Sequence, residues 1–334
     1  MDLSTTYLGF RLPHPFMPGA SPLADSLDTV RRLEDAGAAA IVMRSLFEEQ
    51  LAAEGMAATR SMDTPAYSFP EALTYFPDPE NFVLGPDEYL EKLRQIKAAV
   101  RVPVVASLNG RTPGGWLDYA RLMEEAGADA LELHIYSLPS DPADSGEMIE
   151  ARTVEMVAAV KRLVKIPVAA KVSAFYTSFV NMAVKLDATG VDGLVLFNRF
   201  YHPDIDAENL EIISRLNLSD SNELPLRLRG LALVSGRVKA SLAVTGGVHT
   251  AIDAIKATMC GAQAVQMVSA LLKHGPGHLR TVREEVARWL ETNEYESLQQ
   301  ACGSMSLLKC PDPSPFNRAS YMHVLQTWQM AETP

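Results

Sequence analysis

Two stretches of the sequence carry residues that suit a phosphate group. The first is Thr245-Gly246-Gly247-Val248 and the second is Gln266-Met267-Val268-Ser269-Ala270. A glycine pair lets backbone N–H groups point into a cavity, and the start of a following helix offers an anion further unpaired N–H groups. The two stretches therefore predict the halves of one phosphate cradle, although a glycine pair by itself can also be a tight turn.

Three polar side chains end other apolar runs of the sequence. Lys171 ends one of them, where its ammonium group either stabilises an anion that develops in a site or lies at the surface with its stem buried. Asn109 and Asn198 end two more runs, and an amide that both donates and accepts suits the edge of a heterocycle. Either asparagine alone could be a turn residue, but together with Lys171 they predict a polar ring around a planar ligand.

Eight short apolar runs predict the strands that must position these residues. They cover residues 16–19, 40–43, 102–107, 130–134, 168–172, 193–197, 241–245 and 264–268. Strands that are apolar along their whole length are typical of a parallel sheet covered on both faces. Amphipathic segments between them predict helices over 26–36, 86–100, 116–126, 147–164, 179–189, 231–239 and 250–259. Glycines 37, 127, 190 and 261 suit left-handed C-caps of four of these helices.

This alternation predicts an α/β fold, the (β/α)8 or TIM barrel, in which the active site lies at the carboxyl ends of the strands. An open doubly wound sheet is the alternative, but G-x-G-x-x-G is missing after the first predicted strand. Residues 7–12 predict a hairpin that closes the bottom of the barrel. We expect one barrel domain over 1–300, with a lid insert at about 47–85 between strands two and three, and an extension over 301–334 with a last helix at 320–330.

The composition excludes several classes of protein. Lys plus Arg number 30 against 41 Asp plus Glu, so the net charge is −11, which argues against a nucleic-acid binder or a ligand of anionic membranes. No apolar run approaches the roughly 18 residues of a membrane span, and the first residues do not resemble a signal peptide. The three cysteines match no zinc or iron–sulfur pattern, so we expect no metal site and a reduced, cytoplasmic protein.

Further motifs resemble the dihydroorotate dehydrogenases, a family of FMN-dependent barrels. The segment Pro15-Phe16-Met17-Pro18-Gly19-Ala20-Ser21 resembles the family's first-strand motif, and Glu132-Leu133-His134 resembles its Glu-Leu-Asn. Lys171 falls on its flavin-contacting lysine, Asn198 on an asparagine of its substrate pocket, and the two phosphate stretches match closely. The similarity covers about residues 6–298.

The resemblance implies a bound FMN, whose reduced form a lysine would stabilise. The implied cofactor residues are Ala20, Ser21, Arg44, Ser45, Asn109, Lys171, Gly230, Gly246, Gly247, Val268 and Ser269. Arg44 stands one position along from a second lysine of the family. The implied activity is a CH–CH oxidoreductase of pyrimidine biosynthesis that acts on a C–H bond next to a carbonyl group. It would use a small-molecule substrate and a soluble electron acceptor, in a chain that forms a homodimer.

The substrate loop departs from the family. Ser137 lies at the position of the catalytic base, yet both flanking asparagines are gone, and the family's lid motif is replaced by residues 75–81. We predict Ser137 and Lys171 as catalytic residues, and Asn198, His134 and Tyr136 as substrate contacts, with His134 or Tyr136 as alternative bases. A pocket that has lost paired amides discriminates against a polar orotate ring, so another small cyclic or unsaturated substrate is expected.

Two other functions stay open at this stage. One is a protein that binds FMN without turnover. The other is a phosphate-binding aldolase or sugar-phosphate isomerase in which Lys171 forms a Schiff base.

Overall fold

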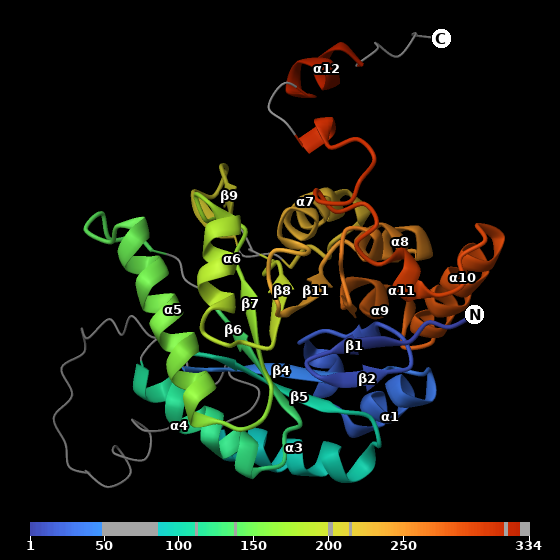
Figure 1. Cartoon of the computed structure of the whole chain (residues 1–334). Helices are drawn as coiled ribbons and strands as arrows, with labels where there is room; N and C mark the ends of the chain where they lie inside the picture. The colour runs from blue at the N-terminus through green and yellow to red at the C-terminus, as the bar shows by residue number, and fades with distance from the viewer. Residues whose placement is uncertain are drawn as a thin grey trace, which may run out of the picture.

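A computed structural model describes residues 1–48, 86–110, 113–136, 139–199, 203–213, 216–316 and 320–327. Eight parallel strands form one sheet in the order β3-β12-β11-β8-β7-β6-β5-β4 (Figure 1). The Ala39 amide donates to the Phe16 carbonyl (2.9 Å), which brings the two ends of the sheet together. The predicted (β/α)8 barrel is therefore confirmed. Its strands are β3 (Phe16–Pro18), β4 (Ile41–Phe47), β5 (Val104–Asn109), β6 (Ala130–His134), β7 (Val168–Val172), β8 (Gly193–Leu196), β11 (Ser241–Thr245) and β12 (Ala264–Met267).

Helices surround the strands (Figure 1). They are α1 (Leu27–Asp35), α3 (Pro86–Ala99), α4 (Pro113–Glu125), α5 (Gly146–Leu163), α6 (Phe179–Asp187), α7 (Leu224–Val234), α8 (Ala251–Met259), α9 (Ser269–His274), α10 (His278–Thr292), α11 (Leu298–Ala301) and α12 (Ser320–Gln326). The four predicted C-cap glycines have positive φ angles between +83° and +117°. One predicted helix was misplaced, since α7 begins at Leu224 rather than at 231 and ends at Val234 rather than at 239. Pro225 lies in its first turn, where a proline starts a helix instead of breaking it.

A hairpin closes the bottom of the barrel, as predicted. Its strands are β1 (Thr5–Tyr7) and β2 (Phe10–Leu12). The side chains of Tyr7, Leu8 and Leu12 are buried against the lower barrel interior, which is lined mainly by alanine and valine. Small residues there leave room for the larger hairpin side chains, so the lower half is a packed apolar core.

The upper half of the barrel interior is polar. Side chains two residues apart on a strand share one face. Ala130 of β6, at the apolar level, is followed on that face by Glu132 and His134, and Ala169 of β7 is followed by Lys171. Gln266 follows Ala264 on β12 in the same way. This change toward the carboxyl ends of the strands is where the fold places chemistry.

Two segments outside the minimal barrel complete the described chain. A short hairpin, β9 (Asp204–Asp206) with β10 (Glu211–Ile213), follows β8 and was not predicted. After α11, the amides of Gly303, Met305 and Leu307 donate to carbonyls of Thr258, Met259 and Ala232 at the ends of α8 and α7. The start of the predicted extension is thus bonded to the barrel, whereas α12 stands apart from it (Figure 1). No helix in the described ranges is long and apolar enough to span a membrane.

The predicted lid insert at 47–85 lies outside the described residues except for Phe47 and Glu48. The last predicted helix coincides with α12 over 320–326, and its predicted end at 330 lies outside them as well.

Candidate active site

A buried ion pair lies at the centre of the polar layer. The Lys171 ammonium nitrogen is 3.2 Å from Oε1 of Glu132, and the Gln266 amide donates to Oε2 of Glu132 (2.6 Å). All three side chains are buried, and Glu132 is inaccessible to solvent. A buried carboxylate of this kind needs a cation and hydrogen-bond donors to keep its charge. Lys171 therefore points into the barrel, as one of its two sequence-based alternatives predicted.

Sequence reasoning quoted Glu132 and Gln266 only as parts of longer motifs and gave neither a role of its own in the site. The available signal was the position of an acid inside an apolar strand, on the same face as the lysine of the next strand. The strand register pairs His134 with Lys171 and places Glu132 beside Ala169, two residue pairs lower and on the same face.

The two predicted asparagines lie at this end of the barrel. Nδ2 of Asn109 donates to the His134 carbonyl (2.9 Å), and Nδ2 of Asn198 donates to the carbonyls of Ile135 and Lys171. Their donors thus hold the loop after β6 against β7. Two acceptors are left over: Oδ1 of Asn198 and Oε1 of Gln266 are buried and have no hydrogen-bond partner among the described residues. Buried polar atoms normally have partners, so these two call for a ligand with donors.

His134 is held by two serines. Its Nδ1 lies 3.1 Å from Oγ of Ser45, which lies 2.7 Å from Oγ of Ser107. The rings of Phe47 and Tyr136 meet the imidazole edge-on, each with a centroid distance of 5.9 Å. Burial, helped by the neighbouring Lys171 charge, lowers the pKa of His134 from 6.5 to about 3. The imidazole is therefore neutral at physiological pH. Ser137, the predicted base, lies outside the described residues.

Strand β4 contains one extra residue, which separates Arg44 from Ser45. Val42 pairs with Val105 but Ser45 pairs with Ser107, so three steps along β4 match two along β5. This bulge turns Ser45 into the barrel interior, while Arg44 binds Asp25 through Nη1 (2.7 Å) and is partly exposed. Two predicted cofactor residues lie on β4. The structure brings Ser45 into the polar layer, whereas Arg44 lies outside this layer and pairs with Asp25.

Ala20 and Ser21 follow β3. Ala20 packs against the interior apolar cluster, and the Ser21 hydroxyl donates to the Gly19 carbonyl (3.0 Å). Both therefore lie at the carboxyl end of the first barrel strand.

The glycine pair forms a left-handed turn after β11. Gly246 and Gly247 have φ angles of +82° and +80°, which L side chains rarely adopt. A Cβ atom on Gly247 would lie 2.6 Å from the Leu224 nitrogen, so it would strike the start of α7. At the start of the neighbouring helix α8, a capping box formed by Thr250 and Asp253 uses the amides of His249, Thr250 and Asp253. The glycine turn itself lies beside Val268 and Ser269, which follow β12.

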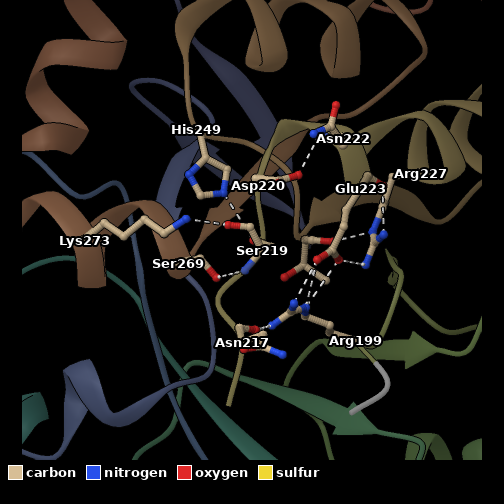
Figure 2. A network of polar contacts seen from close by, with 11 residues as sticks. Arg199, Asn217, Ser219, Asp220, Asn222, Glu223, Arg227, His249, Ser269 and Lys273 are labelled. Atoms are coloured by element: carbon tan, nitrogen blue, oxygen red, sulfur yellow. Dashed lines mark hydrogen bonds and ion pairs between the residues drawn. The ribbon is translucent and has the colours of Figure 1, made fainter. Parts of the chain in front are cut away.

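A third segment, around Ser219, completes the phosphate end (Figure 2). The Ser219 amide donates to Oγ of Ser269 (3.0 Å), its hydroxyl lies 3.2 Å from Nε2 of His249, and its carbonyl accepts from the Lys273 ammonium group (2.9 Å). Ser219 therefore joins the segment before α7 to the residues that follow β11 and β12. Nothing in the sequence indicated this wall, since its neighbours are ordinary turn residues.

Two arginines, Arg199 and Arg227, share the Glu223 carboxylate near the glycine turn (Figure 2). Arg227 is buried on α7, donates to the Thr245 carbonyl (3.2 Å) and pairs with Glu223 (3.5 Å), which also pairs with Arg199 (2.9 Å). A Cβ atom on Gly246 would lie 3.0 Å from Nη2 of Arg227. The guanidinium group of Arg227 therefore lies next to the glycine turn, and Glu223 pairs with both arginines.

Gly230 was a predicted cofactor residue, but it lies within α7. A Cβ atom there would lie 2.5 Å from the ring of Phe197. Close packing of α7 on the end of β8 accounts for this glycine, and the structure does not bring it into the cradle.

Comparison with known proteins identifies the family. A relative from Aeropyrum pernix, named putative dihydroorotate dehydrogenase A (fumarate), is 33% identical over 224 residues, which are 65% of this chain and 72% of the relative. The catalytic subunit of dihydroorotate dehydrogenase B (NAD(+)) from Thermoplasma volcanium is 27% identical over 90% of this chain and 98% of its own length. The Escherichia coli NAD-dependent dihydropyrimidine dehydrogenase subunit PreA is 23% identical over 90% of this chain and 76% of its own length. The sequence profile of the dihydroorotate dehydrogenases matches residues 3–290, so the chain belongs to the dihydroorotate dehydrogenase family.

Proposed function

We propose that the protein is an FMN-dependent oxidoreductase that oxidises a C–H bond next to a carbonyl group in a small cyclic or unsaturated molecule other than dihydroorotate. The observation that carries this proposal is a site with two unlike ends. One end is a buried cation with unpartnered acceptors, and the other is a left-handed glycine turn backed by positive charge. A flavin mononucleotide has a polar ring at one end and a phosphate at the other.

The residues present fit FMN. Lys171, Asn198 and Gln266 would hold the ring, which has one N–H group when oxidised and gains a second on reduction, for the two unpartnered acceptors among them. Gly246, Gly247, Val268 and Ser269 would hold the phosphate, and Ser45 and Asn109, on β4 and β5 next to β6, would lie on the ring side. When bound, FMN supplies a two-electron acceptor for hydride. The lysine ammonium group would favour the reduced, anionic ring.

The Lys171–Glu132 pair favours an oxidoreductase over a Schiff-base aldolase. A Schiff base forms only from a neutral amine, and lysines that act in this way are desolvated or placed near another cation. Here the partner is a carboxylate at 3.2 Å, which stabilises the charged ammonium form.

The substrate end supports a molecule less polar than orotate. The ring edges of Phe47 and Tyr136 flank His134 in the layer where the family has an asparagine. Ser137 remains the proposed base by its place in the loop, with Tyr136 beside it. The names of two relatives give different electron acceptors, fumarate and NAD(+). We therefore propose a soluble electron acceptor and do not choose between these two compounds.

Anaerobic reduction of the purified protein tests this function. The cofactor is first released and identified by mass, and the protein is then mixed with dihydroorotate, dihydrouracil and a panel of cyclic ketones. We expect FMN, and bleaching of its visible absorbance by a carbonyl compound but slow or no bleaching by dihydroorotate. A colourless protein would exclude the proposal. Dihydroorotate turnover with kcat/KM of about 10⁴ M⁻¹s⁻¹ or more would overturn its substrate part.

A second candidate is a protein that binds FMN without turnover, favoured by the loss of the family's asparagines beside Ser137. It predicts that dithionite bleaches the bound flavin while no compound of the panel bleaches it.

Light scattering of the same preparation tests the proposed homodimer.

A further inference from the structure

The hydroxyl groups of Ser107 and Ser45 and the imidazole of His134 form a chain of three polar groups. Its two contacts are 2.7 Å between the hydroxyl oxygens and 3.1 Å from Ser45 to Nδ1 of His134. Each serine brings one hydrogen, and a neutral imidazole brings one on either ring nitrogen. The hydrogen bonds of this chain can therefore point in either of two directions. In one direction Nε2 carries a hydrogen and can donate, and in the other it carries none and can only accept.

Counting hydrogens decides between the two directions. If Nδ1 carried the proton, it would donate to Ser45 and Ser45 would donate to Ser107. The Ser107 hydroxyl hydrogen would then have no acceptor, although Ser107 has no solvent exposure and Oγ contacts no other group in the described part of the chain. In the opposite direction, Ser107 donates to Ser45 and Ser45 donates to Nδ1, so both hydrogens are used. A buried unsatisfied donor costs about 1–3 kcal/mol, which selects the second direction.

Nδ1 is thus an acceptor, and Nε2 carries the proton. Within the described ranges Nε2 makes no hydrogen bond, and the ring contacts of His134 are those with Phe47 and Tyr136. Its register partner across the strands is Lys171. That positive charge and the burial of the ring oppose protonation, so the N–H group remains a neutral donor.

We propose that Nε2–H of His134 binds the carbonyl oxygen of the substrate, and that the Ser107–Ser45 pair fixes it in this role. This inference rests on the proposed function, in which the proton next to the carbonyl leaves to the base and the hydride on the neighbouring carbon leaves to the oxidant. Negative charge then collects on the carbonyl oxygen, where a neutral imidazole N–H can stabilise it. The ligand class is a neutral cyclic carbonyl compound. His134 is a donor in this arrangement, and it is not the base.

Nitrogen-15 spectra of histidine-labelled protein test the donor directly. The His134 signals are assigned by their loss in His134→Gln. We expect the Nε2–H tautomer alone between about pH 5 and 8, the range where an ordinary histidine titrates. An Nδ1–H tautomer, or titration near the ordinary pKa, would overturn the assignment. Ser45→Ala should give a mixture of tautomers, whereas Ser241→Ala, which removes a hydroxyl at the other end of the barrel, should leave the His134 signals unchanged.

A titration tests the ligand class. Adding 2-cyclohexenone should shift the Nε2–H proton signal downfield, and cyclohexene, which lacks the carbonyl, should not. No shift with either compound would overturn the ligand class, as would equal shifts with both.

Turnover separates a donor from a base. With whichever substrate reduces the flavin, His134→Phe should lower kcat/KM by about 100-fold or more, the usual effect of removing one such donor. His134→Gln keeps an N–H donor and should stay within about tenfold of the parent protein. If both variants lose activity equally, the donor role is wrong. If no carbonyl compound is oxidised at all, the proposed function fails, and the spectra and the titration still decide the tautomer and the ligand.

Discussion

The ammonium group of Lys171 is paired with Glu132, a carboxylate that is itself inaccessible to water. Glu132 is buried with the lysine and Gln266 as its partners, so removing the cation leaves a carboxylate without compensation. The Lys171–Glu132 pair therefore stabilises the barrel and also sets the charge in the site. Variants must distinguish the effect on folding stability from the effect on the flavin.

Lys171→Met should destabilise the fold by about 3–5 kcal/mol, the usual cost of breaking a buried ion pair. The double variant Lys171→Met/Glu132→Gln removes both charges and should recover most of that stability, while the flavin stays harder to reduce. Urea unfolding and the flavin midpoint potential give the two readouts. A double variant with a normal potential would contradict the role proposed for the lysine.

His14 makes the free energy of unfolding depend on pH. It is buried before β3 and its Nδ1 accepts from the Phe16 amide, and burial, with the charge of Arg283, lowers its pKa from 6.5 to about 4. Between about pH 4 and pH 6.5, the unfolded chain therefore binds a proton at His14 that the folded chain does not bind. The free energy of unfolding should fall as the pH drops through this window, by up to about 1.4 kcal/mol per pH unit.

His134 contributes in the same direction, because its pKa is also lowered. His14→Gln should flatten the decline seen in urea titrations at several pH values, leaving the part due to His134. If the slope of the His14→Gln protein equals that of the parent, His14 is not the source.

Among the structural elements, the proposed phosphate end is built by three loops, each from a different part of the chain. The turn after β11, the residues after β12 and the segment before α7 meet at Ser219, and Lys273 of α9 adds a cation there. A phosphate dianion bound in this cradle would interact with that charge, whereas riboflavin, which has no phosphate, would not.

Lys273→Met should weaken FMN binding about tenfold, or ~1.4 kcal/mol, and leave riboflavin binding unchanged. Lys256→Met is the matched control, because Lys256 is exposed on α8. Fluorescence quenching measures both flavins. Equal losses for FMN and riboflavin would show that the lysine acts on the fold and not on the phosphate.

The sequence predicted the elements well wherever local patterns decide them. The bounds of β6, β7 and β11 match the prediction, because each is a buried apolar run with clear ends. It failed where distant residues decide, since the bulge in β4 depends on pairing with β5. The early start of α7 was a different error, because Pro225 in its first turn is a local signal that the prediction did not use. The wall around Ser219 carries no local signal, and Glu132 is recognisable only once the strand register is known.

At the scale of the whole molecule, the boundary predicted after residue 300 does not coincide with a break in bonding. The amides of Gly303, Met305 and Leu307 donate to the ends of α8 and α7, and Ser306 is buried. By contrast, α12 exposes Tyr321 and Met322.

A chain that ends at Phe316 should keep the melting temperature of the full protein. A chain that ends at Ala301 should melt several degrees lower, because a loss of about 1 kcal/mol shifts the melting temperature by a few degrees in a protein of this size. Thermal unfolding of the two truncated proteins measures this. Equal melting temperatures would show that the whole extension is independent of the barrel.

The bottom hairpin has a consequence for how the chain is made. The Leu8 amide donates to the Ser241 hydroxyl, the Thr5 hydroxyl donates to the Gln263 carbonyl, and Asp2 forms a bridge with Ser297. The strands of this hairpin therefore bond to partners that are synthesised more than 200 residues later. Until then Tyr7, Leu8 and Leu12 have no interior to enter, so the nascent chain carries an exposed apolar hairpin through most of its synthesis. Closing so long a loop is slow, so the docking of the hairpin onto the β11 and β12 region should be the last step of barrel folding.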